Sequence, residues 1–206
     1  MENCPAFHCL LNHQHPALKD KSKELAKRAS SQFGQLVKVL RTDRNSNKRA
    51  AAAFLIAYDK DGNKVVESLL PSVRDSSSIV RNNAMRVLAE IALRHQDVHI
   101  PLDPILQAIN FPDTTDRNKA AAIIDRLLQR ADSKKLHRRI INQAGEIVLA
   151  MLRLKQPNNH DYAYFILKRL SGKDFGEWNH LAWARWLAEE RVKLNREITE
   201  ASKGGG

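Results

Sequence analysis

The residues best suited to chemistry lie close together near the amino terminus. Two cysteines and three histidines occur within twelve positions: Cys4, His8, Cys9, His13 and His15. Thiolate and imidazole groups bind zinc, so Cys4, His8, Cys9 and His13 form a candidate metal site, although their spacing matches none of the paired arrangements of structural zinc sites. Two other interpretations stay open: a disulfide between Cys4 and Cys9, which requires an oxidising compartment, and thiols without a chemical role.

No second group of residues has the spacing of a reactive site. The other histidines are scattered through the chain: His95, His99, His137, His160 and His180. Glu189 and Glu190 are adjacent, and adjacent positions on a helix do not point in the same direction. The Asp-Phe-Gly triplet at 174–176 matches the magnesium motif of kinases, but none of the other kinase motifs accompanies it. We therefore expect no catalytic residue, no cofactor and no enzyme activity.

The composition predicts that helices carry these residues. The chain has 206 residues, 43% of them hydrophobic, with only 8 glycines and 7 prolines. Good helix formers fill the apolar-periodic segments, while Gly and Pro lie between them, which is typical of helices joined by short loops. The longest apolar stretches, 50–57 and 147–154, are shorter than the roughly 18–20 residues that cross a bilayer. The sequence predicts an all-α protein without membrane insertion.

A repeated segment predicts how the helices are arranged. Residues 42–57 align with residues 74–89 at an offset of 32, and a third copy begins near residue 114 at an offset of 36 from the second. Two polar positions recur in the copies: Asp43, Asp75 and Asp113 before each helix, and Arg49, Arg81 and Arg117 in its first turns. A repeated unit of this length with two helices is typical of a solenoid.

Apolar residues recur in the same copies. In the second copy Ala84, Val87, Leu88 and Ile91 form one helical stripe, in which the small Ala permits close approach of a neighbouring helix. An upstream helix is expected before each copy, at residues 35–40, 63–73 and 102–110, followed by a short polar linker. Linkers this short require antiparallel neighbours.

This pattern of Asp, Arg, Ala and Leu/Ile pairs resembles the second helix of a HEAT repeat, and residues 75–92 are its best example. The chain is similar to small bacterial HEAT-repeat proteins over about residues 30–175. The resemblance implies a right-handed α-solenoid of antiparallel helix pairs, with atypical capping helices at its ends. It also implies a structural ladder of hydrogen bonds between successive repeats, formed by Asp43, Arg49, Asp75, Arg81, Asp113 and Arg117.

We expect a single repeat domain over residues 1–206. It would consist of an amino-terminal cap (1–29), three repeats (30–132), a divergent repeat with a carboxy-terminal cap (133–200) and a flexible tail (201–206). The divergent part is predicted to contain a long helix at 133–155 and a short one at 161–170. Trp183, Trp186 and Leu187 share one helical face and are expected to cover the end of the last repeat.

Stacked helix pairs leave a broad surface, and solenoids usually bind partners there. The predicted outward row consists of Asn82, Arg86, Glu90, Asn118 and Arg126. We expect a non-catalytic scaffold that binds another protein. Because the net charge of the chain is +11, the partner is expected to have an acidic surface. The alternative is nucleic-acid binding, because one bacterial DNA glycosylase family also combines HEAT-like repeats with a basic face. The oligomeric state is open, as is the compartment: the cytoplasm, or export with the signal removed.

Overall fold

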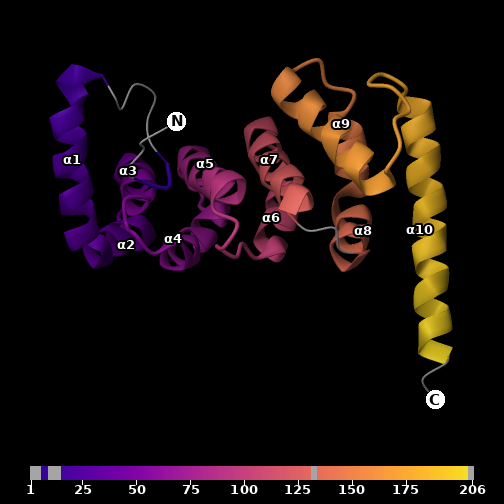
Figure 1. The fold of residues 1–206 in the computed structure, drawn as a ribbon, viewed down its shortest axis with the longest axis horizontal. Helices are drawn as coiled ribbons and strands as arrows, with labels where there is room; N and C mark the ends of the chain where they lie inside the picture. Colours follow the sequence, from indigo (N-terminus) through magenta and orange to yellow (C-terminus); the bar gives the residue numbers. More distant parts are fainter. Residues whose placement is uncertain (1–5, 9–14, 131–133, 204–206) are drawn as a thin grey trace. The chain divides into compact units, whose positions relative to one another are not determined.

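The computed structural model describes residues 6–8, 15–130 and 134–203, which form ten α-helices and one 3₁₀ helix and contain no strand (Figure 1). The predicted all-α class is confirmed. The chain forms two compact units, residues 1–123 (unit 1) and 124–206 (unit 2), and the boundary between them lies within one helix, α7. None of the described helices is long and apolar enough to span a membrane.

Unit 1 consists of short helices joined by tight linkers. They are α1 (Pro16–Ser31), α2 (Phe33–Thr42), α3 (Ser46–Ile56), α4 (Gly62–Leu69), the 3₁₀ helix η1 (Leu70–Arg74), α5 (Ser78–Arg94), α6 (Leu102–Ala108) and the first part of α7 (Thr114–Arg130). The prediction of one continuous helix at 63–73 is wrong, because the chain changes from α-helical to 3₁₀ geometry at Leu70. Pro71 explains the change, since proline has no amide hydrogen and its ring clashes with the preceding helical turn.

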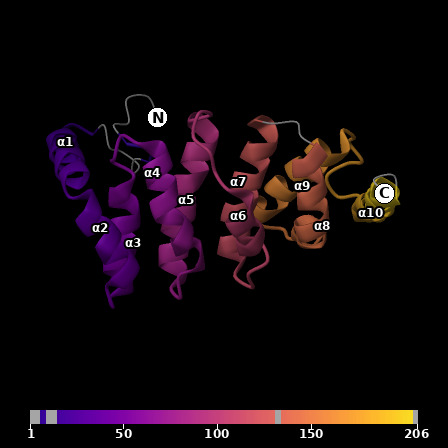
Figure 2. The same ribbon diagram turned by 90° about the horizontal axis from the view of Figure 1, so that it is seen from below.

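The second helices of the predicted pairs form the core of unit 1. Helix α3 packs against α2 and α5, and α5 packs in turn against α4 and η1 (Figure 2). The predicted apolar stripe on α5 is confirmed, because Ala84, Val87, Leu88 and Ile91 are all fully buried. Asn83 on α5 donates a hydrogen bond to the Ala50 carbonyl of α3 at 3.0 Å, so the two helices are also joined by a polar contact.

Unit 2 contains the end of α7 and three further helices: α8 (Lys134–Met151), α9 (Pro157–Ser171) and α10 (His180–Lys203). Helix α8 packs against both α9 and α10. A Cβ atom on Gly145 of α8 would lie 2.9 Å from a methyl group of Leu187, so the absence of a side chain allows α10 to approach closely. Trp183, Trp186 and Leu187 of α10 are buried as predicted.

Three helix ends in unit 2 differ from the prediction. Helix α8 ends at Met151 rather than near residue 155, and α9 begins at Pro157 rather than at 161. Proline suits the first turn of a helix, where its missing amide hydrogen leaves no hydrogen bond unmade. Helix α10 continues to Lys203, so the predicted tail at 201–206 begins with helical residues.

Candidate functional site

The recurring arginines of unit 1 all bind backbone carbonyls six positions earlier in the chain. Arg49 donates from Nη1 to the Asp43 carbonyl at 2.8 Å, and Arg81 from Nη1 to the Asp75 carbonyl at 2.9 Å. Arg117 donates from Nε to the Phe111 carbonyl at 2.7 Å. Each arginine therefore closes the linker that precedes its own helix, which is a structural role.

The recurring aspartates stabilise the same linkers. Asp43, Asp75 and Asp113 each accept a hydrogen bond from the amide two residues later, at 2.8, 2.8 and 3.1 Å respectively. A side-chain oxygen in this position turns the chain and satisfies an amide: the one directly ahead of the helix for Asp43 and Asp75, and one in the first turn of α7 for Asp113. The three predicted aspartates thus share one structural role, the acceptance of a hydrogen bond from a nearby amide, in addition to any contact with an arginine.

A bidentate ion pair of unit 1 joins two of these positions. Arg49 binds both carboxylate oxygens of Asp75, with Nε to Oδ2 at 2.8 Å and Nη2 to Oδ1 at 2.7 Å, and both side chains are only 12% exposed. Burial raises the pKa of Asp75, but hydrogen bonds from Arg49 and the Ser77 amide outweigh it, so this pKa lies below its ordinary value. The same hydrogen bond raises the pKa of Arg49.

Arg81 forms the equivalent pair with a residue that the sequence pattern missed. Its Nε and Nη2 atoms lie 2.8 and 2.7 Å from Oδ2 of Asp116, which is fully buried, whereas the predicted partner Asp113 lies 3.9 Å away. The spacing differs in this copy: Asp113 lies directly before α7 and only four positions before Arg117, whereas Asp43 and Asp75 precede their arginines by six positions. Asp116 lies in the first turn of α7. Arg81 therefore contacts Asp116 more closely than Asp113.

The predicted outward row is divided between exposed and buried positions. Arg86 on α5 is exposed, while Asn82, Glu90 and Arg126 are half-buried. Asn118 is 5% exposed, so its assignment to the outward row is wrong. The sequence pattern assumed one apolar face on α7, but positions 118, 121, 122 and 125 are buried in addition to 120, 123 and 124. The helix is covered on both sides.

Most of the amino-terminal candidate metal site lies outside the described residues, namely Cys4, Cys9 and His13. His8 is described, and its ring stacks on Phe54 of α3 at 5.1 Å. The pKa of His8 is lowered, mainly by burial. Glu90 of α5 raises this pKa and Arg86 of α5 lowers it further, so the side chain of His8 lies near these two residues. The Phe7 amide donates to the Ala57 carbonyl at 2.8 Å and attaches this segment to the end of α3.

The Asp-Phe-Gly triplet of unit 2 has a structural role in the loop before α10. Asp174 accepts hydrogen bonds from Lys168 Nζ at 2.6 Å, the Gly176 amide at 2.9 Å and Tyr164 Oη at 2.8 Å. These contacts, that of Lys168 first, lower the pKa of Asp174 to about 2. The carboxylate thereby attaches the loop to α9.

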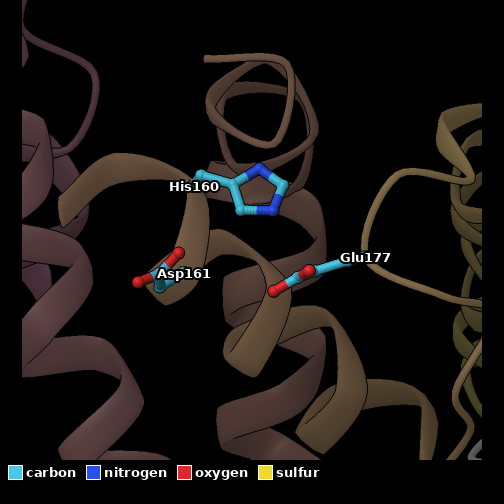
Figure 3. A group of neighbouring side chains, drawn as sticks. All are labelled: His160, Asp161 and Glu177. Atoms are coloured by element: carbon cyan, nitrogen blue, oxygen red, sulfur yellow. The ribbon is translucent and has the colours of Figure 1, made fainter. Parts of the chain in front are cut away.

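Within the described residues, one group of side chains could hold a metal ion. His160 and Asp161 of α9 and Glu177 of the following loop place one ligand atom each within 4.8 Å of one another (Figure 3). The sequence analysis missed this group, because Glu177 lies sixteen positions after Asp161 and belongs to no recognisable spacing. Only the path of the loop brings the three together.

Comparison with known proteins does not extend this description. No protein-family model matches the chain, and no curated protein matches it.

Proposed function

We propose that the chain is a non-catalytic scaffold of the HEAT-repeat type that binds another protein through the surface of its stacked helix pairs. Three successive linkers of unit 1 share one device, an aspartate that caps the next amides and an arginine that returns to the carbonyl six positions earlier. Recurrence of one structural device supports a repeat architecture, and its arginines are occupied by backbone contacts rather than available for chemistry.

The observation that carries the proposal is a stripe along α5, formed by the exposed Ile79, Arg86 and Leu93 and by the half-buried Asn82 and Glu90 between them. These residues are three or four positions apart and therefore follow one face of the helix. Ile79 and Leu93 are 46% and 44% exposed, and the exposed Arg86 lies midway between them in the sequence. Apolar side chains around an arginine are typical of protein interfaces, where Arg is enriched.

The charge pattern of the α5 stripe favours a protein over a nucleic acid. Glu90 accepts a hydrogen bond from Arg94 at 3.0 Å, so this end of the stripe carries a neutralised pair. Phosphate recognition depends on accumulated positive charge, whereas a protein partner could place a carboxylate against Arg86 and apolar residues against Ile79 and Leu93. The inferred partner therefore has an acidic residue flanked by apolar ones.

The test is quantitative affinity capture with the immobilised full-length chain and two variants. Arg86→Glu with Leu93→Ser alters the α5 stripe, and Arg153→Glu is the matched control because it reverses an exposed arginine in unit 2. We expect that the original chain and the Arg153→Glu control capture equal amounts of one partner protein, and that the stripe variant captures much less of it. The proposal fails if every retained protein binds the stripe variant as well as the control.

The second candidate function is nucleic-acid binding, which the net charge of +11 favours. Fluorescence anisotropy with single- and double-stranded DNA and RNA at two salt concentrations tests it. Binding through phosphates alone weakens steeply with salt. Saturable binding near physiological salt would replace the protein partner by a nucleic acid, and Arg86→Glu would then show whether the α5 stripe takes part in it.

A further inference from the structure

We propose that unit 2 binds a divalent transition-metal cation of the Zn²⁺ class through His160, Asp161 and Glu177, between the first turns of α9 and the loop that precedes α10. The inference is independent of the α5 stripe, because the three residues belong to unit 2 and the stripe to unit 1.

His160 is the residue that points most clearly to a ligand. Its side chain is only 2% exposed, and Nδ1 lies 2.8 Å from the Leu152 carbonyl oxygen. A carbonyl only accepts hydrogen bonds, so Nδ1 carries the hydrogen, and in the tautomer that has its hydrogen there Nε2 is the nitrogen with a lone pair. This Nε2 atom is buried and has no hydrogen-bond partner among the described residues.

An imidazole oriented in this way is typical of metal ligands. Metal-bound histidines commonly donate the hydrogen of the other ring nitrogen to a carbonyl or carboxylate, which fixes the tautomer and the ring plane. Trp178 restricts the ring further by stacking on it, with centroids 3.9 Å apart and planes inclined by 16°. The cost of a buried acceptor without a partner is removed when a cation occupies Nε2.

Two carboxylates complete the site. Figure 3 shows Glu177 extending from the loop toward α9, with the Nε2 edge of the His160 ring facing the carboxylate oxygens. The three ligand atoms lie within 4.8 Å of one another, whereas donors on tetrahedral zinc are roughly 3.5 Å apart. Glu177 is exposed and Asp161 half-buried, so these side chains can close the remaining distance.

The donor set selects the class of ion. One imidazole nitrogen and two carboxylate oxygens suit zinc and its neighbours in the first transition row better than the all-oxygen ligands that magnesium and calcium prefer. Two carboxylates neutralise a divalent charge, and three protein ligands leave a coordination position for water. The ion would connect α9 to the loop beside the contacts that Asp174 already makes.

The experiment is calorimetric titration of the full-length chain with Zn²⁺ and, in parallel, Mg²⁺. It is performed in a Cys4→Ser, Cys9→Ser background, because cysteine thiolates bind zinc and would add a second signal to the titration. Glu177→Gln replaces one carboxylate ligand at an exposed position. Glu189→Gln is the matched control, because Glu189 is an exposed residue of α10 and its substitution changes the net charge equally. Tryptophan fluorescence follows the same titration through Trp178.

We expect one Zn²⁺ per chain, preference over Mg²⁺, and a change in tryptophan fluorescence that saturates at the same stoichiometry. Glu177→Gln should weaken binding by at least about tenfold, the loss that even outer-shell substitutions cause, and Glu189→Gln should not. Asp161→Asn should weaken it as Glu177→Gln does. The proposal is overturned if the background protein shows no saturable site, or if Glu177→Gln binds as tightly as Glu189→Gln.

Discussion

Replacing Arg81 by methionine should destabilise unit 1 by about 2–4 kcal/mol. The substitution keeps much of the apolar volume of the side chain but removes two contacts to Asp116, at 2.8 and 2.7 Å, and one to the Asp75 carbonyl at 2.9 Å. Asp116 is fully buried and would be left without its guanidinium partner. Removing one member of a buried pair costs about 3–5 kcal/mol, and the lower range applies here because Arg81 is 15% exposed.

The assay is equilibrium unfolding in urea at pH 7, followed by far-ultraviolet circular dichroism. With a slope of about 2 kcal/mol per molar urea, the expected loss lowers the midpoint by about 1–2 M. All three tryptophans, Trp178, Trp183 and Trp186, belong to unit 2, so their fluorescence provides a separate record of that unit.

Arg86→Met is the matched control for Arg81→Met. The exposed Arg86 lies on the same helix and loses the same charge, so its cost should stay within about 0.5 kcal/mol. Equal midpoints for Arg81→Met and Arg86→Met would refute the reasoning. The pairing can be isolated further, because Asp116→Leu combined with Arg81→Met leaves no buried charge and should recover part of the loss.

Two other predictions concern unit 1. The pKa of Asp75 is lowered in the fold, so the stability that Asp75 contributes is complete above the ordinary aspartate pKa of about 3.9 and is lost as pH falls through the lower folded value. Asp75→Asn should therefore lower the free energy of unfolding at pH 7. It should also flatten the pH dependence of that free energy below about pH 4, as measured by urea titrations. Gly62→Ala should cost about 1–3 kcal/mol, because its Cβ would lie 2.5 Å from Val98 and 2.9 Å from Phe7. Gly34→Ala, with no atom within 4 Å, should instead leave the thermal midpoint unchanged or raise it.

The sequence predicts the parts of this fold that depend on periodicity. The stripe from Ala84 to Ile91 follows from apolar residues at helical spacing, and burial confirms it. Asn118 was misassigned because periodicity identifies one apolar face, while α7 is covered on two, and no local pattern distinguishes a polar residue that is buried from one that is solvated. The repeat pattern does not identify Asp116, because the aspartate of this copy, Asp113, precedes its arginine by four positions rather than six and position 116 has no equivalent aspartate in the other copies.

The candidate metal group could not be predicted in this way. His160 and Asp161 are adjacent on α9, and an isolated pair of this kind is too common to indicate a site. Glu177 reaches them only because the loop turns at Gly172 and Gly176, whose φ angles of 65° and 89° are unfavourable for other residues. Spacing rules capture ligands on one helix or hairpin, whereas this group depends on the path of a loop.

The distribution of arginine contacts bears on the choice between the two proposed functions. Arg49, Arg81 and Arg117 donate to backbone carbonyls inside unit 1, and Arg191 donates to the Ile141 carbonyl at 3.1 Å inside unit 2. The net charge of +11 therefore includes cations that stabilise the fold and that are not positioned to contact phosphates.

Exposed cations are spread over unit 1, and α1 carries the densest run of them. Its exposed basic residues are Lys19, Lys21, Lys23, Lys27 and Arg28, of which Lys23 and Arg28 also contact Asp20 and Glu24. Phosphate binding by unit 1 would use this helix, whereas the apolar ends of the α5 stripe would contribute little to it. Arg86→Glu with Leu93→Ser thus separates the two functions: a nucleic acid held by α1 would survive the change, and a protein held by α5 would not.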